Sequence, residues 1–326
     1  MYFDAHSDIW TDITIHHLNG EHNVFHDRHA ERLKKGGVEG SILVIWVDPP
    51  YDKDYAARTR DIMKSVREEI SEAEDFRIVK SYSDITQAEK DGKIYILLGV
   101  EGLANIGDDP SRIDEYYEFG CRHAMLTWNE ANALAAGAVS GDNYGLTKAG
   151  KKTVRMMQEK GMLVDTSHLN EAGFWDIIDL TSKPIVASHS NASALCGVPR
   201  NLTDDQLRAI AGVGGVVGLN AFAAFTDADP RKATVERLAE HAAHMIDVMG
   251  IDHVGLGFDF CEFLENEDTI ASMGGGEREN LNVRGMADAT QIDRLFICFQ
   301  KMGMSKEDMK KIARDNFRRV IRETIG

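Results

Sequence analysis

Eight short, apolar, β-rich runs alternate along the chain with stretches whose apolar residues recur at helical spacing. Near-continuous apolar runs are typical of parallel strands that are covered on both faces. Their alternation with helices predicts repeated βαβ units, and eight such strands predict a closed (β/α)8 TIM barrel of the α/β class. The predicted strands lie at 2–8, 41–47, 94–102, 123–128, 161–168, 184–190, 215–222 and 253–260.

The helical stretches between these strands carry recognisable start signals. Apolar positions recur at helical spacing in 56–73, 150–161, 204–214 and 235–250, and Thr203 and Ser305 are placed to cap two helix starts. No Pro-rich or Ser-rich linker divides the chain. A length of 326 residues would by itself allow two domains, but the unbroken pattern predicts a single barrel domain over 1–326. Three insertions follow strands and are expected to lie over the barrel mouth, at 48–55, 130–145 and 261–285.

The net charge and the cysteine content limit which binding partners and which cellular compartment we expect for this chain. A net charge of −16 argues against binding to nucleic acid or to an anionic membrane surface, and we interpret the excess acid as a solvated surface. The four cysteines lie far apart and form no CxxC pair, which suits a reducing compartment. No signal peptide is visible, and no apolar run approaches the roughly 18 residues that a membrane span needs. These features favour a cytoplasmic protein.

Polar residues interrupt the apolar runs near their C-terminal ends. His6 and Asp8 are two residues apart in the first run, so they would point the same way from a strand. Later runs repeat the pattern, and the C-terminal ends of barrel strands meet on the face where barrel enzymes hold their active sites. The sequence therefore predicts that six side chains converge there: His6, Asp8, Glu101, His168, His189 and Asp259.

Each of these residues alone would be unremarkable, because a single histidine at a strand end is usually a satisfied core or surface residue. Three histidines and three carboxylates on one rim have no comparable structural explanation. Imidazole and carboxylate ligands suit Zn²⁺ and similar ions. Their number exceeds one tetrahedral site, so two metal ions that share a carboxylate are the simplest arrangement.

A second group of histidines offers a competing metal site. The segment 16–29 holds five histidines in 14 residues: His16, His17, His22, His26 and His29. Short His-rich tracts can bind metals adventitiously. The tract is expected in a polar loop after the first strand, and no helical or CxxC-type spacing organises it. We therefore expect the working metal at the strand ends instead.

Several segments together resemble a known family. DTSH at 165–168 and ASHS at 187–190 place two histidines 21 residues apart, and PRN follows the second. Matching segments span nearly the whole chain, at 4–8, 99–102, 145–168, 184–211, 253–260 and 311–321. In these segments the chain resembles the membrane (renal-type) dipeptidases, peptidase family M19, within the amidohydrolase superfamily.

The resemblance implies a binuclear zinc site. It assigns His6 and Asp8 to one ion and His168 and His189 to the other, with Glu101 bridging the two. It makes Asp259 the proton-transfer residue and Arg200 the group that holds the substrate carboxylate, a task that suits the planar guanidinium fork. It also leads us to expect that Trp128 and Asn220 bind the substrate. The family's habit favours a homodimer, although the sequence identifies no interface.

The chain departs from the family pattern at two positions. Trp128 stands where many relatives carry a histidine that contacts the developing oxyanion, and Phe222 stands where several carry a tyrosine. An indole can donate one N–H but cannot accept a proton. Trp128 could therefore donate to the substrate carbonyl, pack on a substrate side chain, or belong to the barrel core. Packing is the interpretation we favour.

The predicted function is zinc-dependent hydrolysis of dipeptides with a free C-terminal carboxylate, by a metal-bridging hydroxide with Asp259 as general base and acid. Two alternatives stay open. The same site could hydrolyse a cyclic amide, an ester or an N-acyl amino acid. Less favoured is a non-catalytic metal-binding barrel, because no expected ligand is missing and function must be argued from the site.

Overall fold

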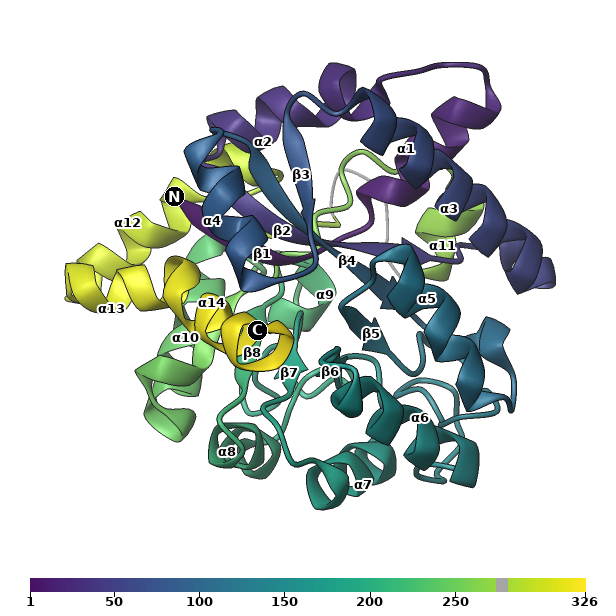
Figure 1. Ribbon diagram of the computed structural model, residues 1–326. Coiled ribbons are helices and arrows are strands. Elements are labelled where there is room, and N and C mark those ends of the chain that lie inside the picture. The colour runs from purple at the N-terminus through teal and green to yellow at the C-terminus, as the bar shows by residue number, and fades with distance from the viewer. Residues whose placement is uncertain (274–280) are drawn as a thin grey trace.

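The computed structural model describes residues 1–273 and 281–326. Within these residues the strands occupy the centre of the molecule and helices surround them (Figure 1). The strands are β1 Tyr2–Ser7, β2 Val38–Trp46, β3 Phe76–Val79, β4 Ile94–Glu101, β5 His123–Met125, β6 Leu163–Asp165, β7 Val186–Ala187, β8 Val216–Leu219 and β9 Val254–Leu256.

The strands form two parallel sheets that lie edge to edge. The first has the order β1-β2-β4-β3 and the second the order β5-β6-β7-β8-β9. Arg122 N, just before β5, donates to Leu98 O of β4 at 2.9 Å. Phe258 N, just after β9, donates to Asp4 Oδ1 of β1 at 2.8 Å. Eight strands thus follow one another in barrel order, and the predicted α/β barrel class is confirmed.

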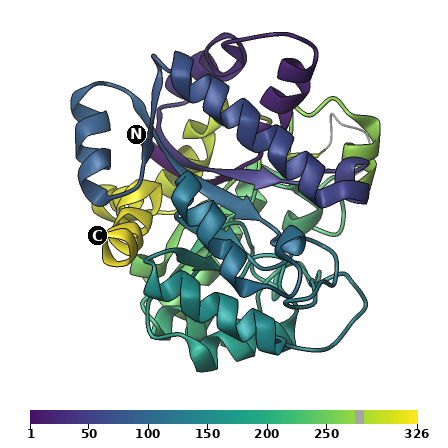
Figure 2. The same ribbon diagram turned by 45° about the vertical axis from the view of Figure 1, so that its right-hand side comes forward.

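The helices cover the outside of the strands, as Figures 1 and 2 show from two sides. Both predicted caps are present, because Thr203 Oγ1 accepts from Gln206 N and Ser305 Oγ accepts from Asp308 N. The α-helices are α1 Ile9–Leu18, α2 Glu31–Lys35, α3 Tyr55–Glu72, α4 Tyr82–Lys90, α5 Ile113–Phe119, α6 Lys148–Glu159, α7 Glu171–Leu180, α8 Asp204–Gly212, α9 Ala223–Thr226, α10 Val235–Met249, α11 Glu267–Ser272, α12 Asp293–Lys301, α13 Lys306–Lys310 and α14 Asn316–Ile325.

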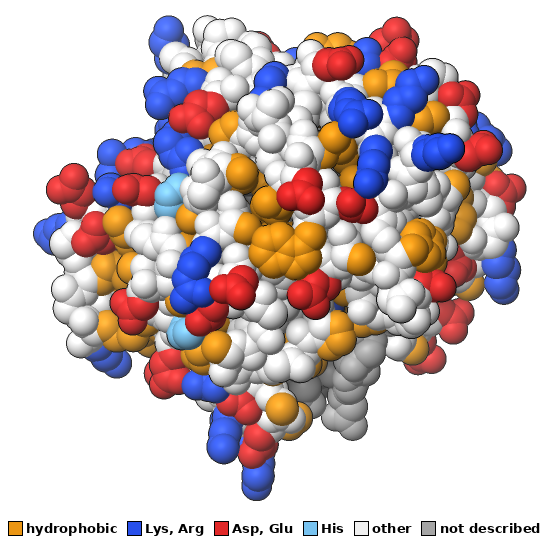
Figure 3. Space-filling model, turned by 90° about the horizontal axis from the view of Figure 1, so that it is seen from below, with side chains coloured by type: hydrophobic (Ala, Val, Ile, Leu, Met, Phe, Trp, Pro, Cys, Tyr) orange, Lys and Arg blue, Asp and Glu red, His pale blue; other side chains and the backbone are white. Residues whose placement is uncertain are grey.

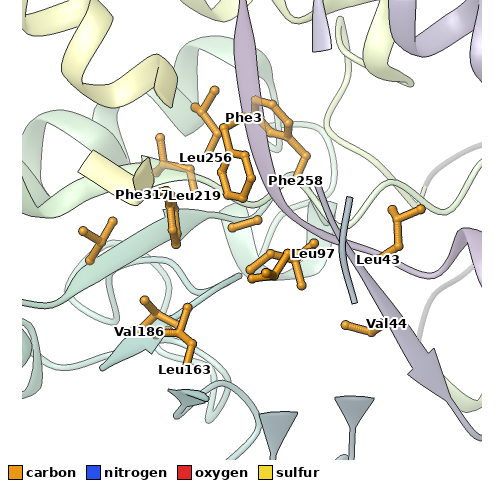
Figure 4. Close-up of a cluster of buried hydrophobic side chains, with 14 of the residues drawn as sticks. Phe3, Leu43, Val44, Leu97, Leu163, Val186, Leu219, Leu256, Phe258 and Phe317 are labelled. Carbon is orange, nitrogen blue, oxygen red and sulfur yellow. The ribbon is translucent and has the colours of Figure 1, made fainter. Parts of the chain in front are cut away.

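The hydrophobic core fills the barrel and the layer between strands and helices. Both sheets contribute buried apolar side chains to it, and α14 adds Phe317 (Figure 4). The ring centroids of Phe3 and Phe317 are 5.6 Å apart, so the last helix packs directly against the first strand. This core leaves the C-terminal ends of the strands as the place where polar side chains can gather.

The predicted strands were too long at their C-terminal ends. The runs 161–168, 184–190 and 253–260 contain strands of only three, two and three residues. His168 and Asp259 have φ angles of 66° and 59°, which are incompatible with a continuing strand. The prediction also missed β3, a four-residue edge strand whose two middle residues are half-exposed, so its apolar signal is weak.

The interpretation of 16–29 as a polar loop was wrong. His16 and His17 lie in α1, and His26 and His29 lie in a π-helix, Phe25–Ala30. Most of the apolar residues of α1 lie before the histidines, and Phe25–Ala30 is too short to show helical periodicity, so the pattern of 16–29 concealed both helices. The predicted insertion 261–285 lies partly outside the described residues, but its segment 267–272 forms α11.

The surface carries charges of both signs. One face shows acidic and basic side chains interspersed rather than separated into a basic patch (Figure 3). In the described part of the chain, no helix is long and apolar enough to cross a membrane.

Candidate metal centre

The six predicted residues come together at the C-terminal ends of the strands. His6 lies within β1, and Glu101 is the last residue of β4. The other four lie in the loops directly after a strand: Asp8 after β1, His168 after β6, His189 after β7 and Asp259 after β9. All six are buried, so the cluster is an interior feature and not part of a solvated surface.

His6 lies at the centre of three carboxylates. Its Nε2 is 3.4 Å from Glu101 Oε2, 3.6 Å from Asp8 Oδ2 and 3.7 Å from Asp259 Oδ1. These separations are too long for direct hydrogen bonds, and among the described residues His6 Nε2 and Asp8 Oδ1 have no hydrogen-bond partner.

The second carboxylate oxygen of Glu101 faces the other two histidines. Glu101 Oε1 is 2.8 Å from His168 Nε2 and 3.6 Å from His189 Nε2. The two imidazole nitrogens are themselves 3.0 Å apart. Glu101 therefore stands between two ligand groups, with one oxygen toward His6 and the other toward His168 and His189.

Neighbouring side chains orient the outer histidines. His168 Nδ1 donates to Asn129 Oδ1 at 3.1 Å, and His189 Nδ1 is 2.8 Å from Ser188 Oγ. These contacts hold each ring with its Nε2 directed into the cluster, and with a metal bound there each Nδ1 would carry the ring proton. Such outer hydrogen bonds fix the tautomer and orientation of metal-binding histidines.

The close approach of strands also depends on glycine. A Cβ at Gly257 would lie 1.7 Å from Ser188 O, and one at Gly218 would lie 1.9 Å from the same atom. Only glycine at these positions lets β8 and β9 come this close to the residue that precedes His189. The sequence GLGFDF thereby brings Asp259 within reach of the histidines.

The electrostatics of the cluster favour a cation. Burial, reinforced by Asp8 and Asp259, raises the pKa of the Glu101 carboxyl to about 8. Burial likewise raises the pKa of Asp259 to about 6. Burial alone would lower the pKa of His6, but Glu101 and Asp8 raise it well above its ordinary value. Buried carboxylates are costly unless a positive charge compensates them.

The outer histidines are in the form that binds metals. Burial lowers the pKa of His168 and of His189 well below the usual range, so both imidazoles are neutral near pH 7. Two groups of buried residues have ligand atoms close enough to hold an ion: His6, Glu101 and His189, and His6, Asp8 and Asp259. Nitrogen and oxygen donors in this mixture fit zinc and similar ions.

The histidine-rich tract forms no such group among the described residues. Its histidines pair with nearby carboxylates instead, as His16 with Glu21, His17 with Glu69, His26 with Asp75 and His29 with Asp12. Four of the five histidines of the tract thus have a structural use, as partners of carboxylates.

A pocket opens directly above the cluster. It has an empty volume of about 370 Å³, part of which is open to solvent. Its lining combines residues of the cluster with apolar side chains and one arginine: Asp8, Trp46, Glu101, Trp128, Asn129, His168, Arg200, Phe222, Phe225, Asp259 and Met273.

The predicted substrate-binding residues occupy different places. Arg200 lines the pocket and is 5% exposed, and burial lowers the pKa of its guanidinium to about 10, so it remains charged. Trp128 is half-buried, packs against the hydrophobic core and also lines the pocket, so a contact with substrate stays a prediction. Asn220 is fully buried, and its Nδ2 donates to Asp259 Oδ2 at 3.1 Å.

Sequence reasoning missed several residues around the site. Trp46 lines the pocket from the end of β2, where the strand-end rule would have found it. Asp4 accepts from Phe258 N and joins β1 to the loop after β9, and its place two residues before His6 was a signal. Asn129 and Ser188 carry no comparable signal, because loop conformation decides what they contact.

A parallel barrel with buried histidines and carboxylates at the C-terminal ends of its strands defines the class of metal-dependent hydrolases. The comparisons identify the family within that class. The sequence profile described as membrane dipeptidase (peptidase family M19) matches residues 1–325. An uncharacterised dipeptidase of Schizosaccharomyces pombe is 30% identical over 331 residues, which cover 96% of this chain and 75% of the relative. The chain belongs to the membrane dipeptidase family and is an enzyme of the metallodipeptidase class.

Two solved structures are similar to the whole chain, each with a TM-score of 0.85 and 25% identity. One is the dipeptidase AC, a metallopeptidase of family M19, with coverage of 100% of this chain and 98% of that one. The other is a metallopeptidase from Rhodobacter sphaeroides liganded with a phosphinate mimic of the dipeptide L-Ala-D-Ala, with 99% coverage of both chains.

Proposed function

We propose that this protein is a zinc-dependent dipeptidase that hydrolyses dipeptides with a free C-terminal carboxylate. The observation that carries the proposal is the content of one small pocket. The candidate metal ligands Asp8, Glu101 and His168 line it together with the buried, charged guanidinium of Arg200. A carboxylate-binding group and a hydrolytic metal centre would therefore face the same substrate.

The ligand sets follow from the two sides of Glu101. His6 and Asp8 would hold one ion, His168 and His189 would hold the other, and Glu101 would bridge them. The support is that Glu101 Oε2 faces His6 at 3.4 Å while Oε1 faces His168 at 2.8 Å. A carboxylate with its two oxygens toward different ligand groups suits a bridging role.

The chemistry is hydrolysis without a covalent intermediate. Two bound zinc ions would supply an activated water near neutral pH and polarise the substrate carbonyl. Asp259 would take a proton from the attacking water and pass it to the leaving amine, as general base and then acid. Its place supports this role, because Asp259 lines the pocket and its Oδ2 is fixed by the Asn220 amide.

Arg200 would set the length of the substrate. A guanidinium pairs with a carboxylate through two parallel hydrogen bonds. Arg200 Nε is buried and has no hydrogen-bond partner among the described residues, so donor capacity is left for a ligand. The pocket has an empty volume of about 370 Å³, part of it open to solvent, so a carboxylate held there would favour short substrates such as dipeptides.

We expect dipeptides to be much better substrates than the corresponding dipeptide amides. A lost hydrogen bond to a charged group costs about 1.5–3 kcal/mol, which corresponds to roughly 10- to 150-fold in kcat/KM. Arg200→Met should reduce kcat/KM for the dipeptide by a similar factor and leave that for the amide nearly unchanged. Steady-state kinetics of the zinc-loaded protein on both substrates would measure these ratios.

Equal rates on a dipeptide and its amide would refute the carboxylate clamp. An N-acyl amino acid, an ester and a cyclic amide belong in the same assay, because these are the other substrates that such a site could hydrolyse. Preference for any of them over free dipeptides would replace the dipeptidase function with another amidohydrolase activity.

We expect Trp128→Phe to keep kcat within about tenfold of the wild type on a good dipeptide. The substitution keeps an aromatic face and deletes the indole N–H. Metal ions bound at the centre would already polarise the carbonyl, so an uncharged donor would add little. If the indole were instead the oxyanion donor, kcat should fall by roughly 10²- to 10³-fold with the fold and zinc content intact.

A further inference from the structure

We propose that the pocket selects dipeptides whose two side chains are both apolar and binds those side chains against two separate aromatic walls. This inference rests on the proposed dipeptidase function and names its substrate class. One wall consists of Trp46 and Trp128, and the other consists of Phe222 and Phe225.

The first step concerns the charged groups that line the pocket. Among the described residues that line the pocket, the charged or metal-binding groups are Asp8, Glu101, His168, Arg200 and Asp259. In the proposed function each of these groups is engaged in metal binding, proton transfer or carboxylate binding. The rest of that lining is apolar except for the Asn129 amide, which accepts a hydrogen bond from His168 Nδ1. In this described part of the lining, a charged substrate side chain would meet no further group of opposite charge.

The second step is the position of the two walls. Trp46 ends β2 and Trp128 follows β5, so the two indoles flank β4 and its terminal Glu101. Their ring centroids are 5.2 Å apart. In barrel order β8 lies across the mouth from β4, and Phe222 and Phe225 follow β8 with ring centroids 4.9 Å apart. The aromatic walls therefore stand on opposite sides of the metal ligands.

The third step assigns the walls to the two substrate residues. The guanidinium carbon of Arg200 lies 5.3 Å from the ring centroid of Phe225. A carboxylate held by Arg200 places the C-terminal residue, and hence its side chain, beside Phe225 and Phe222. The scissile bond must reach the metal ligands, so the N-terminal residue extends toward the tryptophans, with Trp128 6.1 Å from the His168 ring.

The final step is the cost of a mismatch. Trp128 and Phe225 are partly exposed and offer their rings to a substrate side chain, whereas Trp46 and Phe222, each 2% exposed, pack behind them. A substrate side chain that packs on Trp128 or Phe225 gives up part of its contact with water. An apolar side chain gains from that transfer, whereas a charged side chain loses hydration without compensation. Discrimination should therefore appear at both substrate positions.

The test uses two series of dipeptides with the zinc-loaded protein, X-Ala and Ala-X. The side chains of Leu, Asn and Asp have similar shapes. The ratio of kcat/KM between the Leu and Asn dipeptides therefore measures the preference for an apolar side chain, and the ratio between the Asp and Asn dipeptides measures the effect of charge. We expect kcat/KM for Leu to exceed that for Asn by at least about tenfold in both series, with Asp lower still. Asp or Lys dipeptides hydrolysed as fast as Leu dipeptides would overturn the inference.

Variants test the two walls separately. Phe225→Ala should reduce kcat/KM for Ala-Leu more than for Leu-Ala, and Trp128→Ala should do the reverse. Both substrates end in the same free carboxylate, so any disturbance of Arg200 cancels in the ratio between them. Trp175→Ala, on the outer helix α7, is the matched control and should leave the ratio unchanged.

The outcomes separate the inference from the function on which it rests. Dipeptide hydrolysis with an apolar preference and opposite shifts in the two variants would support both. An apolar preference with parallel shifts would overturn the two-wall arrangement. Failure of the folded, zinc-loaded protein to hydrolyse any dipeptide would overturn the dipeptidase function and this inference with it.

Discussion

Removal of metal by a chelator should abolish dipeptide hydrolysis, and added zinc should restore it. The physical reason is the buried cluster around His6, where three carboxylates lie within 3.7 Å of one imidazole nitrogen. Metal binding to such ligands displaces protons and contributes directly to the stability of the folded site. We expect about two zinc ions per chain after purification without chelator, as two ligand groups that share one carboxylate require.

A pair of matched variants locates the metal. His189→Ala should lower the zinc content and the activity together, because its ring lies in the cluster. His22→Ala removes an exposed histidine of the His-rich tract and should change neither quantity. Elemental analysis measures the zinc content of both variants, and a dipeptide hydrolysis assay measures their activity. Full activity in a metal-free preparation, or loss of zinc from the His22 variant alone, would contradict the proposed centre.

The barrel and its active face were predictable because they depend on periodicity. Apolar runs at 94–102 and 253–260 indicate strands, and the barrel geometry then brings residues as distant as His6 and Asp259 together without further information. The extent of each strand was not predictable. A run such as PIVASHS remains apolar enough to suggest a strand, yet only Val186–Ala187 pairs as one. Backbone turns at the functional residues end the strands early.

The residues that support the ligands were harder to find. Asn220 was expected to bind substrate, and the structure places its amide against Asp259 Oδ2, away from the pocket lining. Direct contact between Asn220 and substrate stays a prediction, whereas the structure shows the hydrogen bond from Asn220 Nδ2 to Asp259 Oδ2. Loop residues such as Asn129 depend on how the chain turns after β5, and neither apolar spacing nor residue type records that turn.

The role of Asp259 leads to the other large expected effect. Asp259→Asn keeps the shape of the side chain and removes its ability to accept and return a proton. We expect kcat to fall by roughly 10²-fold or more, which is the scale of general acid–base contributions. KM should change little, because Arg200 and the apolar walls still hold the substrate. The amide oxygen of the substituted side chain can still accept the hydrogen bond that Asn220 Nδ2 donates to Asp259, so the fold should be retained.

Two measurements make this result specific to proton transfer. Zinc content must equal that of the wild type, because Asp259 Oδ1 lies 3.7 Å from His6 Nε2 and lost metal would lower kcat by another route. Asp247→Asn on α10 removes the same charge from an exposed position and should leave kcat unchanged. If Asp259→Asn turns over dipeptides at nearly the wild-type rate with both ions bound, Asp259 moves no proton in the slow step. A different group, or the bound water alone, would then have to protonate the leaving amine.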